Sequence, residues 1–371
     1  MPKKITYIVS NLEKALAFEW IADYLDKKKF ILNFILLNPG NSVLEEFLRA
    51  KQIPVHRILF HGKKDLPAVI FRIVTILLRN KPEVVHTHLF YANVAGLMAA
   101  WICRVPNRIY TRHHSTYHHM YHPGSVKYDR LTNFLATGIV AISKTVEELL
   151  IEKEDVRRKK IKLIHHGFML DDFRNVPADS VTQLHEKYNP SAKHPVIGVI
   201  SRYTEWKGIQ FIIPAFKKLL EKYPQAMLLL ANAEGDYSHR IKSLLRELPE
   251  NSFAEIRFEN NIFALYKLFD VFVHTPIDKY SEAFGQTYVE ALASGVPSVF
   301  TLSGIANEFI IDRQNALVVP YKNSEAVYYA IQELLTDSEL ASELLENGKK
   351  GLEEKFSLHN MISSLEELYT A

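Results

Sequence analysis

Two glutamates lie eight residues apart in the segment Ser281–Val299, on either side of Gly285. Glu282 precedes the glycine, and Glu290 falls within a helix that we expect over 286–294, ended by a Gly-Val-Pro sequence. The free N–H groups at the start of that helix suit an anion, and an acid one turn further can accept hydrogen bonds from ribose hydroxyls. The pattern fits a nucleotide diphosphate-sugar, or an ordinary turn with two surface glutamates.

Two cations follow the strand that we expect over 196–201. Arg202 comes directly after this strand, and Lys207 precedes Gly208, which opens the next helix. Arginine binds phosphate as a fork and lysine as a point charge. Both could stabilise a departing nucleoside diphosphate, which gathers negative charge. The alternative is a solvated loop with two ordinary cations.

Five histidines lie within ten positions: His113, His114, His118, His119 and His122. Such a cluster could hold zinc, but no carboxylate or cysteine accompanies the histidines at a defined spacing. We therefore expect a polar loop of an acceptor site and no metal.

Short apolar runs alternate with helical patterns along the whole chain, which indicates βαβ units and parallel sheets. In the first half we expect strands at 5–9, 30–37, 55–60, 84–87, 108–111, 139–143 and 161–164, and helices at 13–27, 43–51, 66–78, 93–103 and 144–152. In the second half we expect strands at 196–201, 227–231, 254–258, 271–274 and 298–301, and helices at 208–223, 239–248, 262–269, 324–335 and 338–355.

A polar stretch with three prolines, 175–195, is typical of a linker. We therefore expect an α/β protein with two Rossmann-like domains, 1–190 and 195–355, and a final helix, 356–371, that could pack back on the first domain. Because ligands of open parallel sheets bind beyond the carboxyl ends of the strands, two such sheets facing each other would form a cleft between the domains.

The bulk composition is that of a globular protein. The 371 residues include 45 lysines and arginines against 42 acids, a net charge of +3 that is too small to indicate nucleic-acid binding. Cys103 is the only cysteine, which excludes an intrachain disulfide and a thiolate cluster. The N-terminus lacks a signal-peptide pattern, and Arg72 interrupts the longest apolar stretch, 66–78. We expect a cytoplasmic protein, with peripheral contact to the inner face of the membrane left open.

Taken together, several motifs resemble the family 4 retaining glycosyltransferases of the GT-B type, also called glycosyl transferases group 1. The pair Glu282 and Glu290 is similar to that family's Glu-x7-Glu motif, and Arg202 with Lys207 is similar to its diphosphate clamp. Looser matches are Val85–His88, Tyr110–His113, Val140–Ser143, Ile164–Gly167 with Asp171–Phe173, and Ser303–Glu308. The resemblance covers about residues 84 to 335.

The resemblance implies roles for individual residues. Arg202 and Lys207 would hold the donor diphosphate and Glu290 the ribose. Glu282 would contact the transferred sugar. The residues implied by resemblance alone are backbone amides at Ala283, Phe284 and Gly285, a base site near Asn261 and Ile262, His113 beside the sugar or acceptor, and an acceptor side at Asn11, His88 and His114. His88 could equally be a buried structural histidine. The loop Val9–Leu12 departs from the family pattern, because it lacks the usual glycine pair.

The implied activity is that of a hexosyltransferase (EC 2.4). It would move a sugar from a nucleotide-diphosphate-sugar to a hydroxyl of a glycan or lipid-linked saccharide, with retention, in cell-surface polysaccharide synthesis. The family needs neither metal nor cofactor. The alternatives are a nucleotide-sugar epimerase or a sugar phosphorylase on the same fold, and a non-catalytic sugar-nucleotide binding protein.

Overall fold

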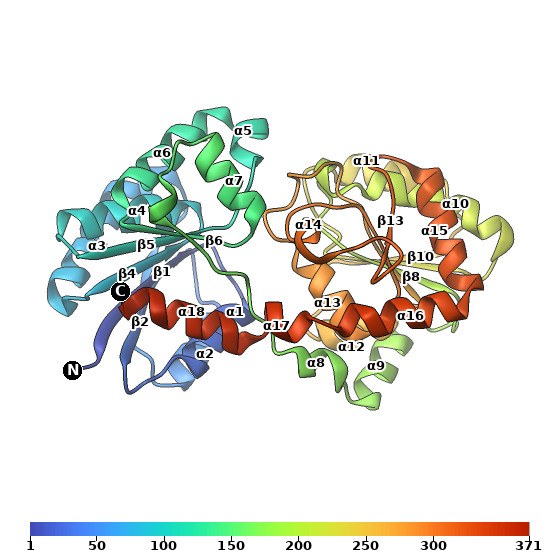
Figure 1. Ribbon diagram of the computed structural model, residues 1–371, viewed down its shortest axis with the longest axis horizontal. Coiled ribbons are helices and arrows are strands. Elements are labelled where there is room, and N and C mark those ends of the chain that lie inside the picture. Colours follow the sequence, from blue (N-terminus) through green and yellow to red (C-terminus); the bar gives the residue numbers. More distant parts are fainter. Residues whose placement is uncertain (371) are drawn as a thin grey trace. The chain divides into compact units, whose positions relative to one another are not determined.

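The computed structural model describes residues 1–370, which form two compact units (Figure 1). The first unit comprises residues 1–168 together with the chain from Leu358 onward, and the second comprises Met169–Ser357. Each unit contains one open parallel sheet with helices on both faces. The predicted α/β class with two Rossmann-like domains is confirmed.

The sheet of the first unit has the strand order β3-β2-β1-β4-β5-β6-β7. Its strands are β1 (Lys3–Ser10), β2 (Phe30–Asn38), β3 (Val55–Leu59), β4 (Val84–His88), β5 (Asn107–Arg112), β6 (Gly138–Ala141) and β7 (Ile161–Leu163). Val9 of β1 pairs with His88 of β4, and His88 pairs with Thr111 of β5. The carboxyl ends of the three central strands therefore lie at one level, where a ligand of such a sheet is expected.

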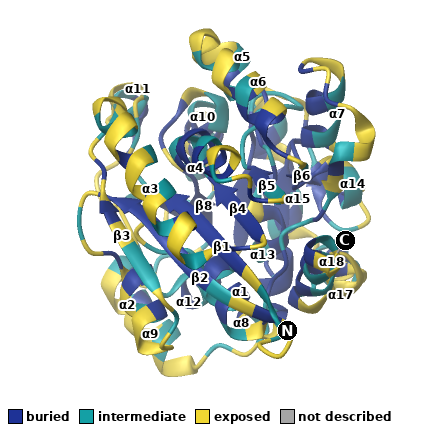
Figure 2. Ribbon diagram, turned by 90° about the vertical axis from the view of Figure 1, so that its left-hand side faces the viewer, coloured by how far each residue is buried: buried dark blue, intermediate teal, exposed yellow. Residues whose placement is uncertain are grey.

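The helices of the first unit cover both faces of its sheet. They are α1 (Leu16–Tyr24), α2 (Val43–Ala50), α3 (Leu66–Asn80), α4 (Phe90–Ile102), α5 (Tyr117–Tyr121), α6 (Val126–Leu135), α7 (Lys144–Glu152) and α18 (Leu358–Thr370), with 3-10 turns η1 (Lys63–Asp65), η2 (Pro123–Ser125) and η3 (Arg158–Lys160). In Figure 1, α3, α4 and α6 lie on one face, and α1, α2 and α18 lie on the other. Figure 2 shows the central strands buried and the outer side of α3 exposed.

The second unit repeats this architecture with the strand order β10-β9-β8-β11-β12-β13. Its strands are β8 (Val196–Ile200), β9 (Met227–Ala231), β10 (Phe253–Ile256), β11 (Val271–His274), β12 (Ser298–Phe300) and β13 (Leu317–Val318). Its helices are α8 (Leu170–Arg174), α9 (Ala178–Tyr188), α10 (Ile209–Lys222), α11 (Ser238–Leu245), α12 (Ile262–Tyr266), α13 (Gln286–Ser294), α14 (Ala306–Phe309), α15 (Ser324–Thr336), α16 (Ser338–Lys349) and α17 (Leu352–Phe356), with the 3-10 turn η4 (Glu205–Lys207). One hydrophobic core packs α10, α11 and α15 on one face of this sheet.

The boundary between the units lies earlier in the chain than the sequence predicts. The stretch 175–195, expected as a linker, contains the helix α9, and α8 precedes it. Phe173 of α8 packs edge-on against Phe263 with ring centroids 4.7 Å apart, and the Tyr188 hydroxyl donates to Glu259. Residues 169–188 therefore belong to the second unit. The sequence hid α9 because Leu184 is its only buried residue.

Three further expectations need correction. Residues 338–355 form two helices, because Gly351 adopts a left-handed φ of 78° between them. Helix α5 occupies part of the histidine-rich segment that was expected as a loop, and α6 lies where no element was expected. Helix α1 spans Leu16–Tyr24, which is shorter than the expected 13–27.

The C-terminal helix packs on the first unit. The Lys3 ammonium donates to the Tyr369 carbonyl over 3.0 Å, and the Tyr369 hydroxyl contacts His86 Nδ1 at 2.6 Å and the Tyr7 hydroxyl. Within residues 1–370, none of the helices combines the length and apolar character that a bilayer span requires.

Candidate functional site

The loop before α13 carries the first predicted glutamate. Gly285 precedes this helix with φ 87°, and a Cβ at this position would lie 2.6 Å from the Tyr288 ring. Only glycine fits such a backbone without strain. Helix α13 then runs over Gln286–Ser294, as predicted, and Gly295 ends it in the left-handed conformation. The first turn of α13, with its free N–H groups, begins four residues after Glu282 in the sequence.

Glu282 is buried and held from three sides. The Lys207 ammonium lies 2.5 Å from its Oε1, and His274 Nε2 lies 3.0 Å from the same oxygen. Its backbone N–H donates to Ser303 Oγ over 2.9 Å. No other residue of the described chain binds Oε2 of Glu282. The carboxylate is therefore fixed in place with one oxygen left for a ligand.

The electrostatic surroundings keep Glu282 ionised. Burial alone would raise the pKa of Glu282, but the charge of Lys207 and the hydrogen bond from His274 outweigh burial and lower it to about 2. Burial lowers the pKa of His274, whose imidazole is therefore neutral at pH 7. A neutral His274 donates from Nε2, while its buried Nδ1 has no partner within residues 1–370.

Gly208 brings Lys207 to this carboxylate. It adopts φ 76° after η4, and a Cβ there would lie 1.8 Å from the Thr275 carbonyl oxygen. The loop after β8 thus touches the loop after β11. Arg202 also follows β8, and its exposed guanidinium forms no ion pair with any described residue. The two predicted cations therefore differ, since one is already paired and the other is free for a ligand.

Glu290 lies one turn into α13, on the same helix as predicted. The Tyr266 hydroxyl donates to its Oε2 over 2.9 Å, and no described residue binds its Oε1. Burial raises the pKa of Glu290 to about 7, although the hydrogen bond from Tyr266 lowers it in part. Glu290 therefore exchanges a proton near neutral pH.

The predicted base region lies at the start of α12. The Asn261 side chain accepts from the Ala264 N–H over 3.1 Å and caps α12, whose first residue is Ile262. The Glu259 carboxylate accepts from the Asn261 N–H over 2.9 Å and from the Tyr188 hydroxyl over 2.6 Å. These hydrogen bonds hold the loop to α9 and α12 and satisfy the polar groups named.

The first unit brings two of its predicted site histidines together. His88 Nδ1, at the end of β4, lies 3.1 Å from His113 Nε2, just after β5. His113 also stacks on His166 with ring centroids 5.7 Å apart. Burial holds the pKa of His88 and of His113 well below the usual range, so both are neutral at pH 7. The predicted Asn11 lies just beyond β1 with φ 51°.

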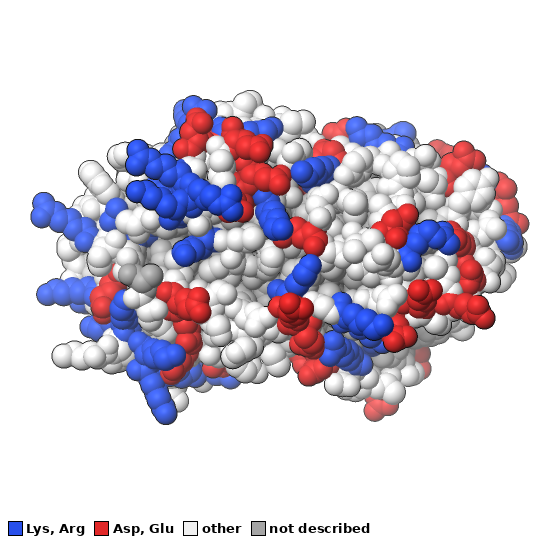
Figure 3. Space-filling view, in the orientation of Figure 1, with Lys and Arg blue, Asp and Glu red and all other residues white. Residues whose placement is uncertain are grey.

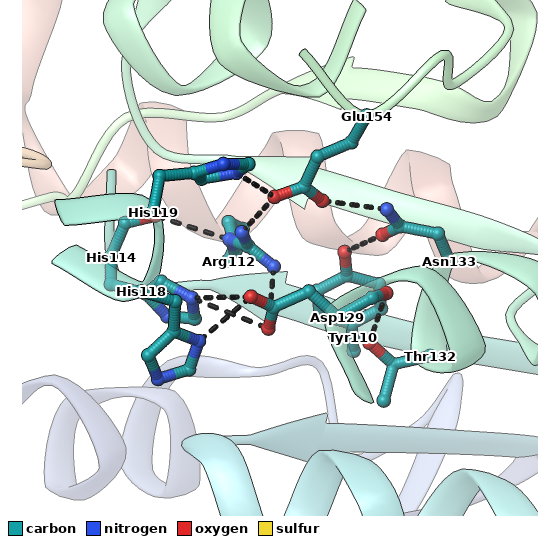
Figure 4. Close-up of polar contacts among 9 residues, drawn as sticks. All are labelled: Tyr110, Arg112, His114, His118, His119, Asp129, Thr132, Asn133 and Glu154. Atoms are coloured by element: carbon teal, nitrogen blue, oxygen red, sulfur yellow. Dashed lines mark hydrogen bonds and ion pairs between the residues drawn. The ribbon is translucent and has the colours of Figure 1, made fainter. Parts of the chain in front are cut away.

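His114 joins a different group of residues, shown in Figure 4. Arg112 is fully buried, lies 3.0 Å from Asp129 and pairs also with Glu154. His114 and His118 contact the Asp129 carboxylate at 3.4 and 2.7 Å. His119 contacts Glu154 at 3.1 Å, and Asn133 and Tyr110 extend the network. Three of the five clustered histidines thus surround a buried ion-pair network and do not form one loop with His113.

The histidines of this network belong to the cluster for which the sequence analysis considered a metal site. His114, His118 and Asp129 could each offer a ligand atom, and these atoms lie within 4.8 Å of one another. The Arg112 guanidinium, however, already neutralises Asp129 and would repel a second cation beside it. The donor set therefore fits a metal poorly.

Sequence reasoning missed three polar partners of the predicted glutamates: His274, Ser303 as a hydrogen-bond acceptor, and Tyr266. His274 ends a strand that was predicted over its full length, 271–274. A polar residue at a strand's carboxyl end was the available signal, because loops at that edge form the ligand site.

Comparisons with known proteins agree with this architecture. The model for the Glycosyltransferase Family 4 domain matches residues 21–172, and the model for Glycosyl transferases group 1 matches residues 180–351. The capsular polysaccharide biosynthesis glycosyltransferase CapM of Staphylococcus aureus is 26% identical over 355 residues, which are 87% of this chain and 91% of that protein. The N-acetyl-alpha-D-glucosaminyl L-malate synthase of Bacillus anthracis is 24% identical over 242 residues, 64% of this chain and 62% of that protein.

Solved structures show the same fold. The Anabaena protein HepE, in complex with UDP-glucose, aligns over 99% of this chain and 100% of its own, with a TM-score of 0.84 and 22% identity. A glycosyltransferase from Rickettsia africae aligns over 100% of this chain and 98% of its own, with a TM-score of 0.81 and 22% identity. These matches define a glycosyltransferase with the two Rossmann-like domains of the GT-B fold. Within that class the chain belongs to glycosyltransferase family 4.

Proposed function

We propose that the protein transfers a sugar from a nucleotide-diphosphate-sugar to a hydroxyl of a glycan or lipid-linked saccharide, with retention of the anomeric configuration. The observation that carries this proposal is the fixed, ionised Glu282 beside Lys207 at the start of α13, with Glu290 on the same helix. Helix α13 and the loop before it thereby offer amides for a phosphate and two acids for hydroxyls.

The diphosphate would bind to the cations and to the helix start. Arg202 would add a fork of N–H donors and Lys207 a point charge, and the loop Ala283–Gly285 would add backbone N–H groups at the positive end of α13. These groups stabilise the charge that gathers on the leaving diphosphate as the glycosidic bond breaks. Since protein cations provide this charge, we propose that the reaction needs no metal and no cofactor.

The hydroxyl groups of the donor would bind to the two free carboxylate oxygens. Oε2 of Glu282 is available to a hydroxyl of the transferred sugar, and Oε1 of Glu290 is available to the ribose. The base would lie against the backbone at Asn261 and Ile262, whose loop is held by Glu259. Because the HepE complex contains UDP-glucose, uracil is the first base to test.

The acceptor would bind at the neutral histidines of the first unit. Neutral imidazoles at His88 and His113 can donate or accept a hydrogen bond without repelling a neutral sugar hydroxyl. For retention we assign no protein nucleophile, and we propose that the leaving phosphate takes the proton of the attacking hydroxyl. A role in cell-surface polysaccharide synthesis is proposed from the similarity to CapM.

The test begins with the base and ends with turnover. Thermal unfolding with UDP, GDP, ADP and TDP should show one nucleotide that raises the midpoint, because a ligand at 100 times its Kd adds about 2.7 kcal/mol. Glu290→Ala and Arg202→Ala should lose that response. Arg246→Ala, an exposed arginine after α11, is the matched control and should keep it.

Turnover with the matching sugar nucleotide then separates the alternatives. A transferase releases the nucleoside diphosphate in proportion to added acceptor saccharide. Donor conversion without any acceptor would indicate an epimerase, and a requirement for inorganic phosphate would indicate a phosphorylase. Binding of the donor with no turnover across an acceptor panel would indicate a non-catalytic protein.

A further inference from the structure

The strand-start edge of the first unit lies opposite the edge that carries His88 and His113. Helices α3, α4 and α6 run antiparallel to the strands, so their last turns meet at this edge. Each last turn carries large apolar side chains that face solvent. These are Leu78, Trp101, Ile102 and Phe134, with 57%, 55%, 51% and 76% of their surface exposed. Single exposed apolar side chains are common, but a group of them on one surface marks an interaction site.

The three helix ends are neighbours. Cys103 Sγ, just after α4, lies 3.7 Å from the carbonyl oxygen of Val74, less than two turns before the end of α3. The Arg108 guanidinium donates to the Val105 carbonyl over 2.7 Å and to the Leu135 carbonyl over 2.9 Å. This arginine ties the loop after α4 to the end of α6. The four apolar side chains therefore form one row across the three helix ends, which we call the apolar row.

Cations surround the apolar row. Six exposed ones lie on its helices and the adjoining loops: Arg79, Lys81, Arg104, Arg130, Arg157 and Lys159. None of these six side chains forms an ion pair with another residue of the range 1–370. The exposed acids of the same loops and helix ends are Glu83, Glu152 and Asp155. Figure 3 shows lysines and arginines gathered over the end of the first unit where its strands begin.

Other cations at this edge have a structural task, which sets the six apart. The Lys160 ammonium donates to the carbonyl oxygens of Asn133 and Phe134 and so closes the end of α6. Arg108 does the same for Leu135. The six exposed cations perform no such task for the fold, so their charge is available to a partner.

A pocket adjoins the apolar row at Phe134. Its volume is about 630 Å³, within the range of small-ligand pockets. Its cationic lining comes from Arg130, Arg157, Lys159 and Lys160. The pocket therefore offers cations to a phosphate group directly beside an exposed aromatic ring.

We propose that this edge docks the protein on a bilayer that contains anionic phospholipids. Each apolar tip has a cation close to it in sequence: Arg79 follows Leu78, Arg104 lies three residues after Trp101, and Arg130 lies one turn before Phe134. This alternation of apolar side chains and cations matches the surface of a bilayer, where phosphate groups lie directly above the hydrocarbon chains. Tryptophan favours the bilayer interface, and each lysine or arginine near an anionic leaflet raises binding by about five-fold.

The test uses the full-length protein and sedimentation with two kinds of vesicle. Vesicles of phosphatidylcholine with about a third phosphatidylglycerol should bind at least ten-fold more protein than phosphatidylcholine alone, and added salt should weaken this binding. Emission of Trp101 should shift to the blue on binding, and Trp101→Phe should abolish that shift. Trp101→Ser with Phe134→Ser, or Arg157→Glu with Lys159→Glu, should lower binding at least ten-fold.

The matched control is Phe258→Ser, which removes an aromatic ring of similar exposure from the second unit and should bind as the parent protein does. All substituted positions are exposed, and thermal unfolding checks that each variant is folded. Equal binding to both kinds of vesicle overturns the proposal. The proposal is likewise overturned if the variants of the apolar row or of the cations bind as the parent protein does. It is also overturned if the parent protein binds neither kind of vesicle at low salt, and an acidic protein is then the better partner for this face.

Discussion

The Lys207 ammonium lies 2.5 Å from Glu282 Oε1, and His274 donates to the same oxygen. The loops that follow β8 and β11 of the second unit meet in this contact. The pair lies beyond the carboxyl ends of β8 and β11, which is where open parallel sheets bind their ligands. The same contact is therefore expected to affect both the stability of the fold and the proposed binding of the donor.

Removing one partner of this pair should be costly. Lys207→Met leaves the Glu282 carboxylate buried without its main counter-charge, so we expect a loss of about 3 kcal/mol in the free energy of unfolding. The double variant Lys207→Met with Glu282→Gln should recover most of that loss and still lack transferase activity. Urea unfolding measures the stability. If the double variant is as unstable as Lys207→Met, the pair is not the cause.

The same pair predicts an acid limit to stability. The pKa of Glu282 is about 2 in the folded protein, below its ordinary 4.5. A lowered pKa stabilises the fold above pH 4.5, and this contribution, about 3 kcal/mol, disappears as the pH falls from about 4.5 to about 2. Unfolding free energies of the parent protein should therefore fall more steeply across this range than those of Glu282→Gln.

Glu290 predicts the opposite pH dependence. Burial raises its pKa to about 7, so the carboxyl group stabilises the fold when protonated and loses this contribution as the pH rises from 4.5 through 7. Glu290→Gln stays neutral and should be more stable than the parent protein at pH 8, by up to about 3 kcal/mol. It should nevertheless bind nucleotide more weakly. Equal stability at pH 8 would show that burial does not raise the pKa of Glu290.

The buried Arg112 network should be a stability element. Arg112→Met leaves Asp129 and Glu154 buried without their cation, and we expect a loss of about 3–5 kcal/mol. Arg79→Met removes an exposed arginine of the same unit and should change the free energy of unfolding by less than about 0.5 kcal/mol. A small effect of Arg112→Met in urea unfolding would contradict the burial of an intact ion-pair network.

His113 should affect turnover and leave donor binding alone. It contacts His88 in the first unit, whereas the proposed donor groups lie in the second. His113→Ala should remove a hydrogen bond to the acceptor, lower kcat/KM for the acceptor by about ten-fold, and change nucleotide affinity less than two-fold. His61→Ala, an exposed histidine of the same unit, is the control. A parallel loss of nucleotide affinity in His113→Ala would place this histidine at the donor instead.

Much of the architecture could be predicted because its signals are local. The strands at 227–231 and 271–274 and the helix at 286–294 match the structure residue for residue, since apolar runs and a closing glycine mark them. Helix α9 was missed because its single buried residue gives no apolar stripe.

The environment of the glutamates could not be predicted in the same way. Burial and the partners His274 and Tyr266 depend on tertiary packing, which no local pattern encodes. The five clustered histidines illustrate the same limit. Their spacing is local, but the structure divides them among the His88 contact, the Arg112 network and a contact of His122 with the Tyr117 hydroxyl.

The most direct measurement is calorimetric titration with the preferred nucleoside diphosphate and its monophosphate, for the parent protein, Arg202→Ala and Arg246→Ala. We expect the parent protein and Arg246→Ala to bind the diphosphate at least ten-fold more tightly than the monophosphate. Arg202→Ala should lose most of this preference, because the removed guanidinium is one of the groups proposed to hold the second phosphate. Equal affinity for the two nucleotides in the parent protein, or an unchanged preference in Arg202→Ala, would contradict the proposed diphosphate site.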